Sequence, residues 1–375
     1  MSDGSIFLRS DGKWAAKYKH PNTTKTKYLY GKSEKEVKKK LREYKQEVMR
    51  NPITVKKMSV QKYMNDWLIN VESNRLKPKS FDRKETTLIN QVYPKIGDLQ
   101  IASLTANDVQ NMINELLAEG LSYSTIKKAY DSVNACFKLG VIKEEIARNP
   151  CLGVKLPTKH KKKSGDIEFF TEDEAQRICE VSKSIYNNGK MVYRLGYAIV
   201  LLMYTGLRIG ELLDLKWSDF NADAKTLTID SSIVLIKNRN VNKATNYILE
   251  VQDYTKTEAG IRTVYLSQKA IAAIEELRKI NGRFERIVSN AKGEIADPTN
   301  IDRMFRQIQK RCGIKKTSGV HILRHTFASM LFKKGVDVKT VSELLGHASV
   351  QITYDTYIHL IKEQKQQAIT LLDDL

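Results

Sequence analysis

The chain has 375 residues, 41% of them hydrophobic, and its 63 lysine and arginine residues against 43 aspartate and glutamate residues give a formal net charge of +20 at pH 7. This charge favours a polyanionic partner such as nucleic acid, because lysine and arginine release counterions when they neutralise phosphates, although ribosomal and membrane-surface proteins share it. The sequence has no N-terminal apolar segment and no long uncharged apolar run, so neither secretion nor membrane spanning is indicated. Its four cysteines lack the CxxC spacing of zinc sites, which indicates a reducing compartment.

The first strands of the chain are predicted in residues 1–52, which we interpret as a separate domain. Trp14, Ala16 and Tyr18 alternate with lysines, which is the period-two pattern of a strand with one apolar and one basic face. A second run of this kind extends from Lys25 to Tyr30. We therefore expect a small three-stranded sheet whose apolar face packs inward.

A helix should follow these strands, because Ser33 and Glu36 have the spacing of a capping box. Positions 1–50 contain 14 basic and 6 acidic residues, which favours a phosphate-binding surface over an ordinary solvated face. The lysines expected to make these contacts on the outward face of the sheet are Lys13, Lys17, Lys19, Lys25 and Lys27.

Residues 55–154 have helical periodicity and predict an all-α domain. Thr105 and Asp108 should cap one helix, and another should run from Ser124 to the Asn149-Pro150 pair. No residue here indicates chemistry, although one cationic run could grip a phosphate backbone; it consists of Arg75, Lys77, Lys79, Arg83 and Lys84.

A basic linker is predicted at residues 155–165, where apolar periodicity is missing and a proline and a glycine lie near the two ends. We expect an extended tether that lets the domains on either side close around a nucleic acid duplex. The linker lysines expected to contact phosphates are Lys159, Lys161, Lys162 and Lys163.

The last domain, residues 166–375, should begin with a helix that is capped by Thr171 and Glu174. Its periodicity is mainly helical, with β-rich segments between Leu227 and Leu266. Lys256 precedes a Glu-Ala-Gly turn signal there, so we expect it near the tip of a β-hairpin that could reach into a groove.

The last domain also contains a scattered set of cationic and nucleophilic residues, without the clustered carboxylates that a metal would need. Such a set suits metal-free attack on a phosphodiester: guanidinium groups stabilise charge on the nonbridging oxygens, an imidazole accepts a proton, and a lysine donates one to the departing oxygen. The set consists of Arg208, Lys256, His321, Arg324, His347 and Tyr357.

Two of these assignments have competitors. Tyr354 lies one helical turn before Tyr357 and is an alternative nucleophile. Lysine and arginine positions near Lys256 compete with it as proton donors; they are Lys237, Lys243 and Arg262. Glu211, one turn after Arg208, is expected to hold that guanidinium in place.

Five segments of the chain, in order, resemble the tyrosine recombinase (phage integrase) family. They read TGLRIGELLDLKW, TKTEAGIRTVYL, HILRHTFASML, LLGHASVQ and TYIH. An ordered set of five is a specific signal, whereas any single segment could arise by chance. The resemblance implies a multidomain fold: a three-stranded sheet with a helix that is similar to the arm-site-binding domain of mobile-element integrases, an all-α core-DNA-binding domain, and a mainly α, α+β catalytic domain.

The resemblance also implies a role for each residue of the set. Tyr357, which precedes Ile358-His359, matches the nucleophile, and Arg208 and Arg324 match the groups that stabilise the phosphate. His347 matches the residue that hydrogen-bonds the scissile phosphate, Lys256 the general acid and His321 a proton-transfer residue. His325 follows Arg324 directly and is interpreted as structural.

The function that the resemblance implies is site-specific recombination for integration and excision of a mobile element. Strands would be cut and rejoined through a 3′-phosphotyrosine intermediate and a Holliday junction, without metal, nucleotide or other cofactor. The expected partners are double-stranded core and arm DNA sites, a homotetramer formed by exchange of the C-terminal tail, an excisionase and a host DNA-bending protein. We expect a cytoplasmic, nucleoid-associated bacterial protein.

Three other functions explain part of the pattern. A type IB topoisomerase has a similar catalytic set but would relax supercoils without synapsis, and a chromosome-dimer-resolving recombinase would lack the N-terminal sheet. An architectural DNA-binding protein would explain the charge but not the presence of competent residues at every position of the catalytic set.

Overall fold

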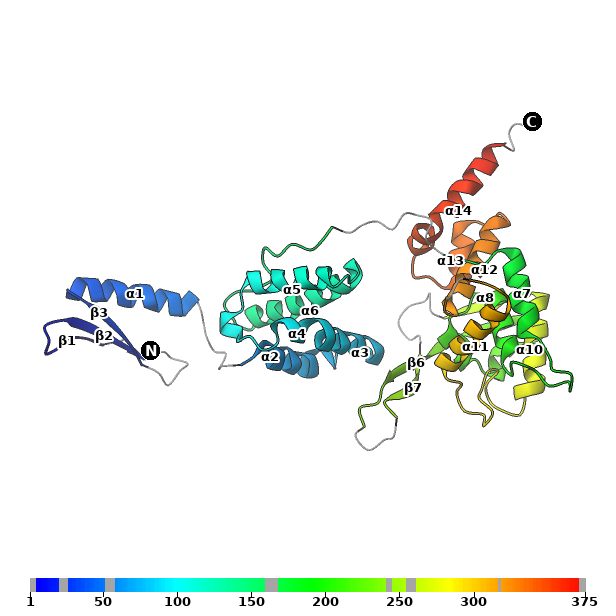
Figure 1. The fold of residues 1–375 in the computed structure, drawn as a ribbon, viewed down its shortest axis with the longest axis horizontal. Coiled ribbons are helices and arrows are strands. Elements are labelled where there is room, and N and C mark those ends of the chain that lie inside the picture. The colour runs from blue at the N-terminus through cyan, green and yellow to red at the C-terminus, as the bar shows by residue number, and fades with distance from the viewer. Residues whose placement is uncertain are drawn as a thin grey trace. The chain divides into compact units, whose positions relative to one another are not determined.

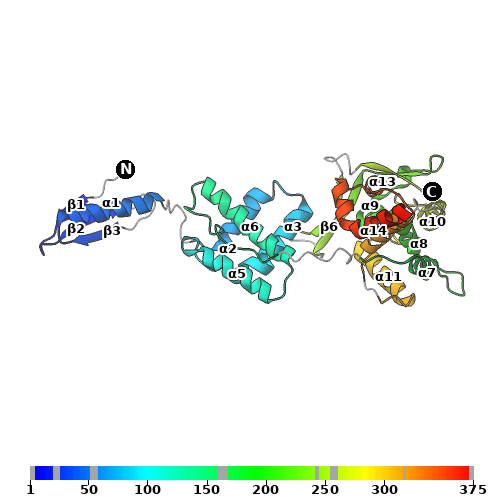
Figure 2. The same ribbon diagram turned by 90° about the horizontal axis from the view of Figure 1, so that it is seen from above.

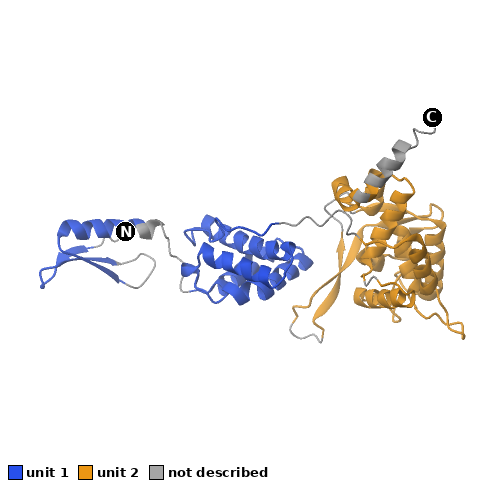
Figure 3. Cartoon of the chain, turned by 45° about the horizontal axis from the view of Figure 1, so that its top comes forward, with its two compact units in different colours: residues 1–160 blue, residues 161–375 orange. Residues whose placement is uncertain are grey.

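The structure is a computed structural model that describes residues 5–19, 26–50, 58–158, 168–240, 245–253, 261–315 and 318–370 (Figure 1). The chain divides into two compact units, residues 1–160 and 161–375 (Figure 3). No helix among the described residues is long and apolar enough to cross a membrane.

The N-terminal part of the first unit is an antiparallel sheet in the order β1 (Ser5–Leu8), β2 (Trp14–Lys19) and β3 (Thr26–Gly31), with α1 (Glu34–Arg50) packed on one face (Figure 1, Figure 2). Ala16 and Tyr18 pack against α1 in a small core of their own. The predicted sheet and helix are confirmed.

The outward face of this sheet differs from the prediction. Lys17 faces outward, opposite Tyr28, whose ring stacks on Tyr30 at a centroid distance of 6.5 Å. Lys27 pairs with Tyr18 and therefore belongs to the face that α1 covers, since paired residues point to the same side of a sheet. The outward face is thus aromatic and basic rather than a row of lysines.

The second part of the first unit is helical, as predicted, with its own apolar core. It consists of α2 (Val60–Trp67), α3 (Pro78–Thr87), α4 (Tyr93–Ile96), α5 (Ala106–Ala118) and α6 (Tyr123–Ile142), with π-helical turns at Leu68–Glu72 and Leu88–Val92. The predicted capping of α5 by Thr105 and Asp108 is confirmed.

The last helix of this unit, α6, has different ends from those predicted. It begins after Ser122, whose hydroxyl accepts from the Thr125 amide, and it ends at Ile142. Glu144 then adopts a left-handed φ of 58°, which turns the chain out of the helix well before Asn149-Pro150.

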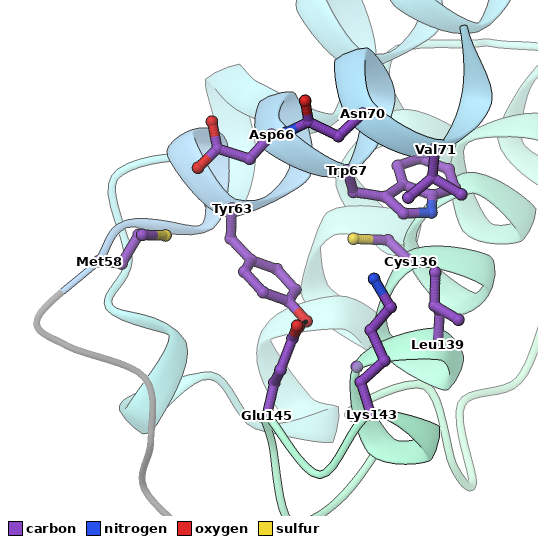
Figure 4. A pocket seen from close by; sticks show the side chains of 11 residues that line it. Met58, Tyr63, Asp66, Trp67, Asn70, Val71, Cys136, Leu139, Lys143 and Glu145 are labelled. Atoms are coloured by element: carbon purple, nitrogen blue, oxygen red, sulfur yellow. Dashed lines mark hydrogen bonds between the residues drawn. The ribbon is translucent and has the colours of Figure 1, made fainter. Parts of the chain in front are cut away.

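A pocket of about 350 Å³ opens between α2 and α6 (Figure 4). Tyr63 and Trp67 line it from α2 and Cys136 from α6. The Tyr63 hydroxyl donates to Glu145 Oε2 at 2.5 Å, and burial is the main cause that raises the pKa of this hydroxyl. The hydrogen bond joins α2 to the segment that follows α6.

The second unit is mainly helical around one large core. Its helices are α7 (Glu172–Ser182), α8 (Gly196–Thr205), α9 (Ile209–Asp214), α10 (Gln268–Asn281), α11 (Pro298–Arg311), α12 (His321–Lys333), α13 (Val338–Leu345) and α14 (Val350–Thr370). The capping box of Thr171 and Glu174 at the start of α7 is confirmed.

The β-rich segment of the second unit forms two sheets. Strands β4 (Phe220–Asn221), β5 (Thr226–Ile229) and β8 (Arg262–Tyr265) form one, and β6 (Ser231–Lys237) and β7 (Tyr247–Asp253) form a hairpin. The predicted hairpin around Lys256 is wrong, because β7 and β8 on either side of it pair with different partners. Lys256 itself lies outside the described residues.

Candidate active site

Five of the six predicted catalytic residues are described, and they lie on or beside four helices of the second unit. Arg208 is the residue before α9, and His321 and Arg324 lie in the first turn of α12. His347 follows α13, and Tyr357 lies within α14. Helices α12, α13 and α14 are in mutual contact, so they bring their residues to one region.

The end of α8 and the start of α9 place Arg208 through backbone geometry. Gly206 ends α8 in the left-handed conformation, with φ 65°, and Arg208 is extended, with φ −73° and ψ 148°. The Glu211 carboxylate accepts from the Arg208 amide at 2.8 Å, so it caps the first turn of α9. The TGLR segment is thus a helix end followed directly by a helix start.

Glu211 also binds two guanidinium groups. Its carboxylate accepts from Arg208 Nη1 at 2.7 Å and from Arg262 Nη2 at 2.8 Å and Nη1 at 3.2 Å. The side chain is fully buried; burial alone would raise its pKa, but the hydrogen bonds and charges of the two arginines lower it to about 2. Glu211 therefore remains a carboxylate and fixes both arginines.

Arg262 was considered above only as a competitor of Lys256, and the structure gives it a different position. Besides its two bonds to Glu211, its Nε donates to the Leu344 carbonyl at 3.3 Å. It therefore joins β8 to α9 and to the end of α13. No local pattern predicts this contact, because it depends on how segments that are distant in the chain pack together.

Arg324 is a buried guanidinium that donates to main-chain carbonyls. Only 3% of the residue is exposed, and its Nη1 and Nη2 donate to Gly206 O at 2.8 Å and Leu345 O at 2.6 Å. Burial and the neighbouring charge of Arg208 lower its pKa to about 9. Arg208 Nη2 likewise donates to a carbonyl, that of Gly346, at 3.2 Å. Both arginines thus contact the carbonyl ends of helices.

His347 is oriented by a buried hydroxyl. Its Nδ1 lies 2.7 Å from Oγ1 of Thr353, a residue with no exposed surface. Burial, with the charges of Arg324 and Arg208, lowers the pKa of His347 to about 4. The imidazole is therefore neutral at pH 7.

Tyr357 is almost fully buried, with 1% of the residue exposed, among residues of α12, α13 and α14. Its backbone angles, φ −114° and ψ 21°, interrupt the regular helix of α14. Its hydroxyl lies 2.8 Å from Nδ1 of His325, and burial raises the pKa of this hydroxyl. Tyr354 is partly buried and packs against the same cluster.

The histidine that contacts Tyr357 is His325, whereas the sequence predicted His321 as the histidine of the site. His325, interpreted as structural, contacts the tyrosine, while His321 is exposed and packs edge-on against His325 at a ring-centroid distance of 4.9 Å. The placement of His325 away from the site is thus wrong. The i, i+4 spacing of the two histidines, which places them on one face of a helix, was the available signal.

The predicted DNA-contacting lysines are only partly described. Lys13 and Lys17 are exposed in the N-terminal sheet region, and Lys27 lies on the helix side of the sheet. In the cationic run of the helical part, Arg75 and Lys84 both pair with the buried Glu72, so they stabilise that fold. The side chains of the remaining predicted DNA-contacting lysines are not among those described; they are Lys19, Lys25, Lys159, Lys161, Lys162 and Lys163.

The start of the predicted C-terminal tail packs on its own unit. Leu360 and Ile361 are buried beside Tyr357 in the cluster formed with α12 and α13. The side chains of residues 362–375 lie outside the description. Within the described residues, no three His, Cys, Asp or Glu side chains are grouped to hold a metal ion.

Two segments of the chain match known protein families. Residues 168–364 match the phage integrase family, and residues 59–117 match the phage integrase N-terminal SAM-like domain. A XerC-like tyrosine recombinase of Caldanaerobacter subterraneus subsp. tengcongensis is 31% identical over 372 residues, covering 93% of this chain and 92% of the relative. The ICEBs1 integrase of Bacillus subtilis is 26% identical over 314 residues, covering 80% and 78%.

Solved structures share the fold at lower identity. The Tn1549 transposon integrase in complex with transposon right-end DNA has a TM-score of 0.68 and 19% identity, covering 84% of this chain and 100% of that one. A lambda integrase tetramer bound to a Holliday junction has a TM-score of 0.59 and 18% identity, covering 94% and 95%. Over the parts that they cover, both structures share the fold of this chain.

Proposed function

The chain belongs to the phage integrase family of tyrosine recombinases, and on this premise we propose how its second unit cuts and rejoins DNA. It is a site-specific recombinase, an enzyme of DNA strand cleavage and ligation, of the kind that integrates and excises a mobile element. The observation that carries the assignment of the site is that Arg208 and Arg324 both bind carbonyls at the end of α13, directly before His347, while α14, which carries Tyr357, packs against α12 and α13.

The proposed nucleophile is Tyr357. Its oxygen attacks a phosphodiester, a 3′-phosphotyrosine linkage forms, and the bond to the 5′ oxygen breaks. Arg208 and Arg324 donate to the nonbridging oxygens, where negative charge gathers in the transition state, and His347 adds a further donor. Lys256 is the proposed acid that protonates the 5′ oxygen. The exposed His321 is the proposed proton-transfer residue, which accepts the proton of the tyrosine hydroxyl.

Rejoining is the reverse of cleavage with a 5′ hydroxyl from a partner duplex. The linkage energy is kept in the phosphotyrosine, so no nucleotide is consumed. Exchange of one strand pair gives a Holliday junction, and we propose a homotetramer on two duplexes as the assembly, by analogy with the lambda integrase structure. An excisionase, a DNA-bending protein and action on nucleoid DNA in the cytoplasm belong to the same proposal.

Buried Tyr357 implies a rearrangement before cleavage. A hydroxyl in a cluster with Phe332 and Leu345 cannot contact a phosphate on a duplex outside the protein. The backbone of α14 is already non-helical at Tyr357, so the helix can change direction at this residue. We propose that DNA binding shifts α14 so that the tyrosine reaches the arginines.

Covalent trapping tests the nucleophile. A nicked suicide substrate is made from the junction of the excised circular element, and the protein–DNA adduct is digested and mapped. We expect the adduct on Tyr357, its loss in Tyr357→Phe and its persistence in the matched control Tyr354→Phe. An adduct that survives in Tyr357→Phe would refute the assignment.

A chromosome-dimer-resolving recombinase is the second candidate, favoured by the XerC-like name of the 31% identical relative. The two functions differ in their substrates. An integrase should join an element end pair to an unrelated target, whereas a dimer resolvase should act between two copies of one chromosomal site. Recombination assays with both substrate pairs in one host strain separate them.

A further inference from the structure

Three arginines each bind one of the last three main-chain carbonyls before His347, at the end of α13. The bonds run from Arg262 Nε to Leu344 O at 3.3 Å, from Arg324 Nη2 to Leu345 O at 2.6 Å and from Arg208 Nη2 to Gly346 O at 3.2 Å. The carbonyls at the end of a helix carry its partial negative charge, so cations are favoured there. Arg208 and Arg324 have proposed roles at the scissile phosphate, whereas Arg262 has none.

Arg262 is too buried to contact DNA itself. Its side chain is 8% exposed, against 36% for that of Arg208. All three of its side-chain nitrogens donate within the protein, Nη1 and Nη2 to the Glu211 carboxylate and Nε to the Leu344 carbonyl. Glu211 thus binds one buried guanidinium and one that is partly exposed.

The charges of this cluster determine what Arg208 can offer to a phosphate. Arg208 and Glu211 alone would form a neutral pair, whose carboxylate would compete with a phosphate for the same guanidinium. Arg262 adds a second positive charge, so the three side chains together keep one net positive charge. Burial raises the pKa of Glu211, but Arg262 lowers it more than Arg208 does, and the result is about 2. Arg262 is therefore the main partner of this carboxylate.

We propose that Arg262 is a positioning residue, which neutralises Glu211 and holds the end of α13 so that the charge of Arg208 remains available for the scissile phosphate. The inference rests on the proposed role of Arg208 at that phosphate. None of these contacts involves α14, so the proposed shift of that helix does not have to break them. Without Arg262, the Glu211 carboxylate would draw Arg208 towards itself, and the phosphate would meet a weaker donor.

The test measures single-turnover cleavage of the trapping substrate, at saturating DNA, by full-length wild type, Arg262→Met and Arg262→Lys. Removing one oxyanion donor typically costs about 100-fold to 1000-fold in rate, and weakening it should cost part of this. We therefore expect Arg262→Met to cleave at least about 10-fold more slowly than wild type, with DNA affinity within about threefold. Lysine keeps the charge but not the two-pronged contact, so Arg262→Lys should cleave at an intermediate rate. Thermal melting checks that each variant is folded, and Arg262→Lys decides if Arg262→Met is not.

A substrate with an uncharged scissile group separates a role at the phosphate from a role in folding. In a methylphosphonate, a methyl group replaces one nonbridging oxygen, so less negative charge gathers in the transition state and less compensation by Arg208 is needed. We expect both Arg262 variants to cleave this substrate within about threefold of wild type. The matched control is Arg286→Met, which breaks another buried ion pair, with Asp214, and should keep the wild-type ratio of rates on the two substrates.

Three results would overturn the proposal. Cleavage of the phosphate substrate by the folded Arg262 variants within about threefold of wild type would show that Arg208 does not need Arg262. An equal loss of rate on the phosphate and methylphosphonate substrates would mean that Arg262 only supports the fold. Recovery of Arg262→Met on a substrate with sulfur in place of the 5′ bridging oxygen would assign the defect to the acid, proposed as Lys256, because a thiolate leaves without a proton.

Failure of the proposed function has a different signature. Arg208→Ala should lose rate on the phosphate substrate and recover on the methylphosphonate, more strongly than the Arg262 variants do. If it does not recover, Arg208 does not bind the scissile phosphate, whatever the Arg262 variants do. If Arg208→Ala recovers and the folded Arg262 variants behave alike on both substrates, the proposed function stands and the role of Arg262 is refuted.

Discussion

Replacing Glu211 by glutamine should release the two arginines that its carboxylate holds. The substitution preserves the shape of the side chain but removes the charge opposite Arg208 and Arg262. The buried guanidinium of Arg262 and the partly exposed guanidinium of Arg208 would then lie beside a neutral amide. Removing one partner of a buried ion pair is strongly destabilising, because the remaining charge has no compensation.

The magnitude follows from the pKa of the carboxyl group. Its value falls from 4.5 to about 2 in the folded protein, and each unit corresponds to about 1.4 kcal/mol of preference for the charged form. We therefore expect Glu211→Gln to lower the free energy of unfolding of the second unit by about 3 kcal/mol at neutral pH. Loss of Arg208 orientation should also abolish strand cleavage.

The effect should depend on pH in a defined direction. A carboxyl group with a depressed folded pKa stabilises the fold fully above its unfolded value and loses this contribution as pH falls. The difference between wild type and Glu211→Gln should thus be largest above pH 4.5 and shrink towards pH 2.

Urea unfolding followed by Trp217 fluorescence measures this difference. Trp14 and Trp67 lie in the first unit, so Trp14→Phe and Trp67→Phe give a background in which Trp217 alone reports on the second unit. The control is Glu343→Gln, which removes an exposed carboxylate of α13 and should change stability by less than about 0.5 kcal/mol. An unchanged unfolding midpoint for Glu211→Gln, or a difference that is the same at pH 3 and pH 7, would refute the reasoning.

Four other outcomes are expected. Gly206→Ala should destabilise the second unit by about 2 kcal/mol in thermal or urea unfolding, because the position has φ 65° and an added Cβ would meet the ring of Phe327. Thr353→Val should slow single-turnover cleavage without weakening DNA binding, because His347 loses the hydroxyl that orients it; equal rates would exclude this role. The pKa values of His325 and His347 are lowered to about 4, so below about pH 6.5 the unfolded chain binds more protons than the folded one. The free energy of unfolding should therefore fall as the pH decreases from about 6.5 towards 4. Replacing either histidine by asparagine should make the free energy of unfolding depend less on pH in this range. Cleavage should persist in EDTA, and its loss on chelation, with recovery on adding a divalent cation, would overturn the metal-free mechanism.

Local signals predicted the elements of the fold well. The capping pairs Thr105–Asp108 and Thr171–Glu174 were identified correctly because each depends on atoms three residues apart. The alternating pattern around Trp14 identified the first sheet because it, too, depends only on residues that are close together in the sequence. The end of α6 was placed too late because no proline or glycine marks the left-handed turn at Glu144.

Predictions that depended on long-range packing were less complete. The order of the motifs identified Arg208, Arg324 and Tyr357. In the structure, α12 and α14 pack together, and Arg208 binds the Gly346 carbonyl beside them. The sequence did not identify Arg262 as a partner of Glu211, since 51 residues separate the two positions. Nor did it show that β7 and β8 pair in different sheets, because a turn signal does not reveal which strands become neighbours.

The surroundings of Arg324 have a consequence for how the protein is handled in solution. Its described hydrogen-bond partners are uncharged carbonyls, and its positive charge is buried, so it favours a small oxyanion of any origin. If Arg324 binds the scissile phosphate as proposed, we expect sulfate and inorganic phosphate to compete with DNA for this arginine. The affinity for DNA should therefore differ between chloride and sulfate buffers of equal ionic strength. DNA affinities of this enzyme can thus be compared only when they are measured with the same buffer anion.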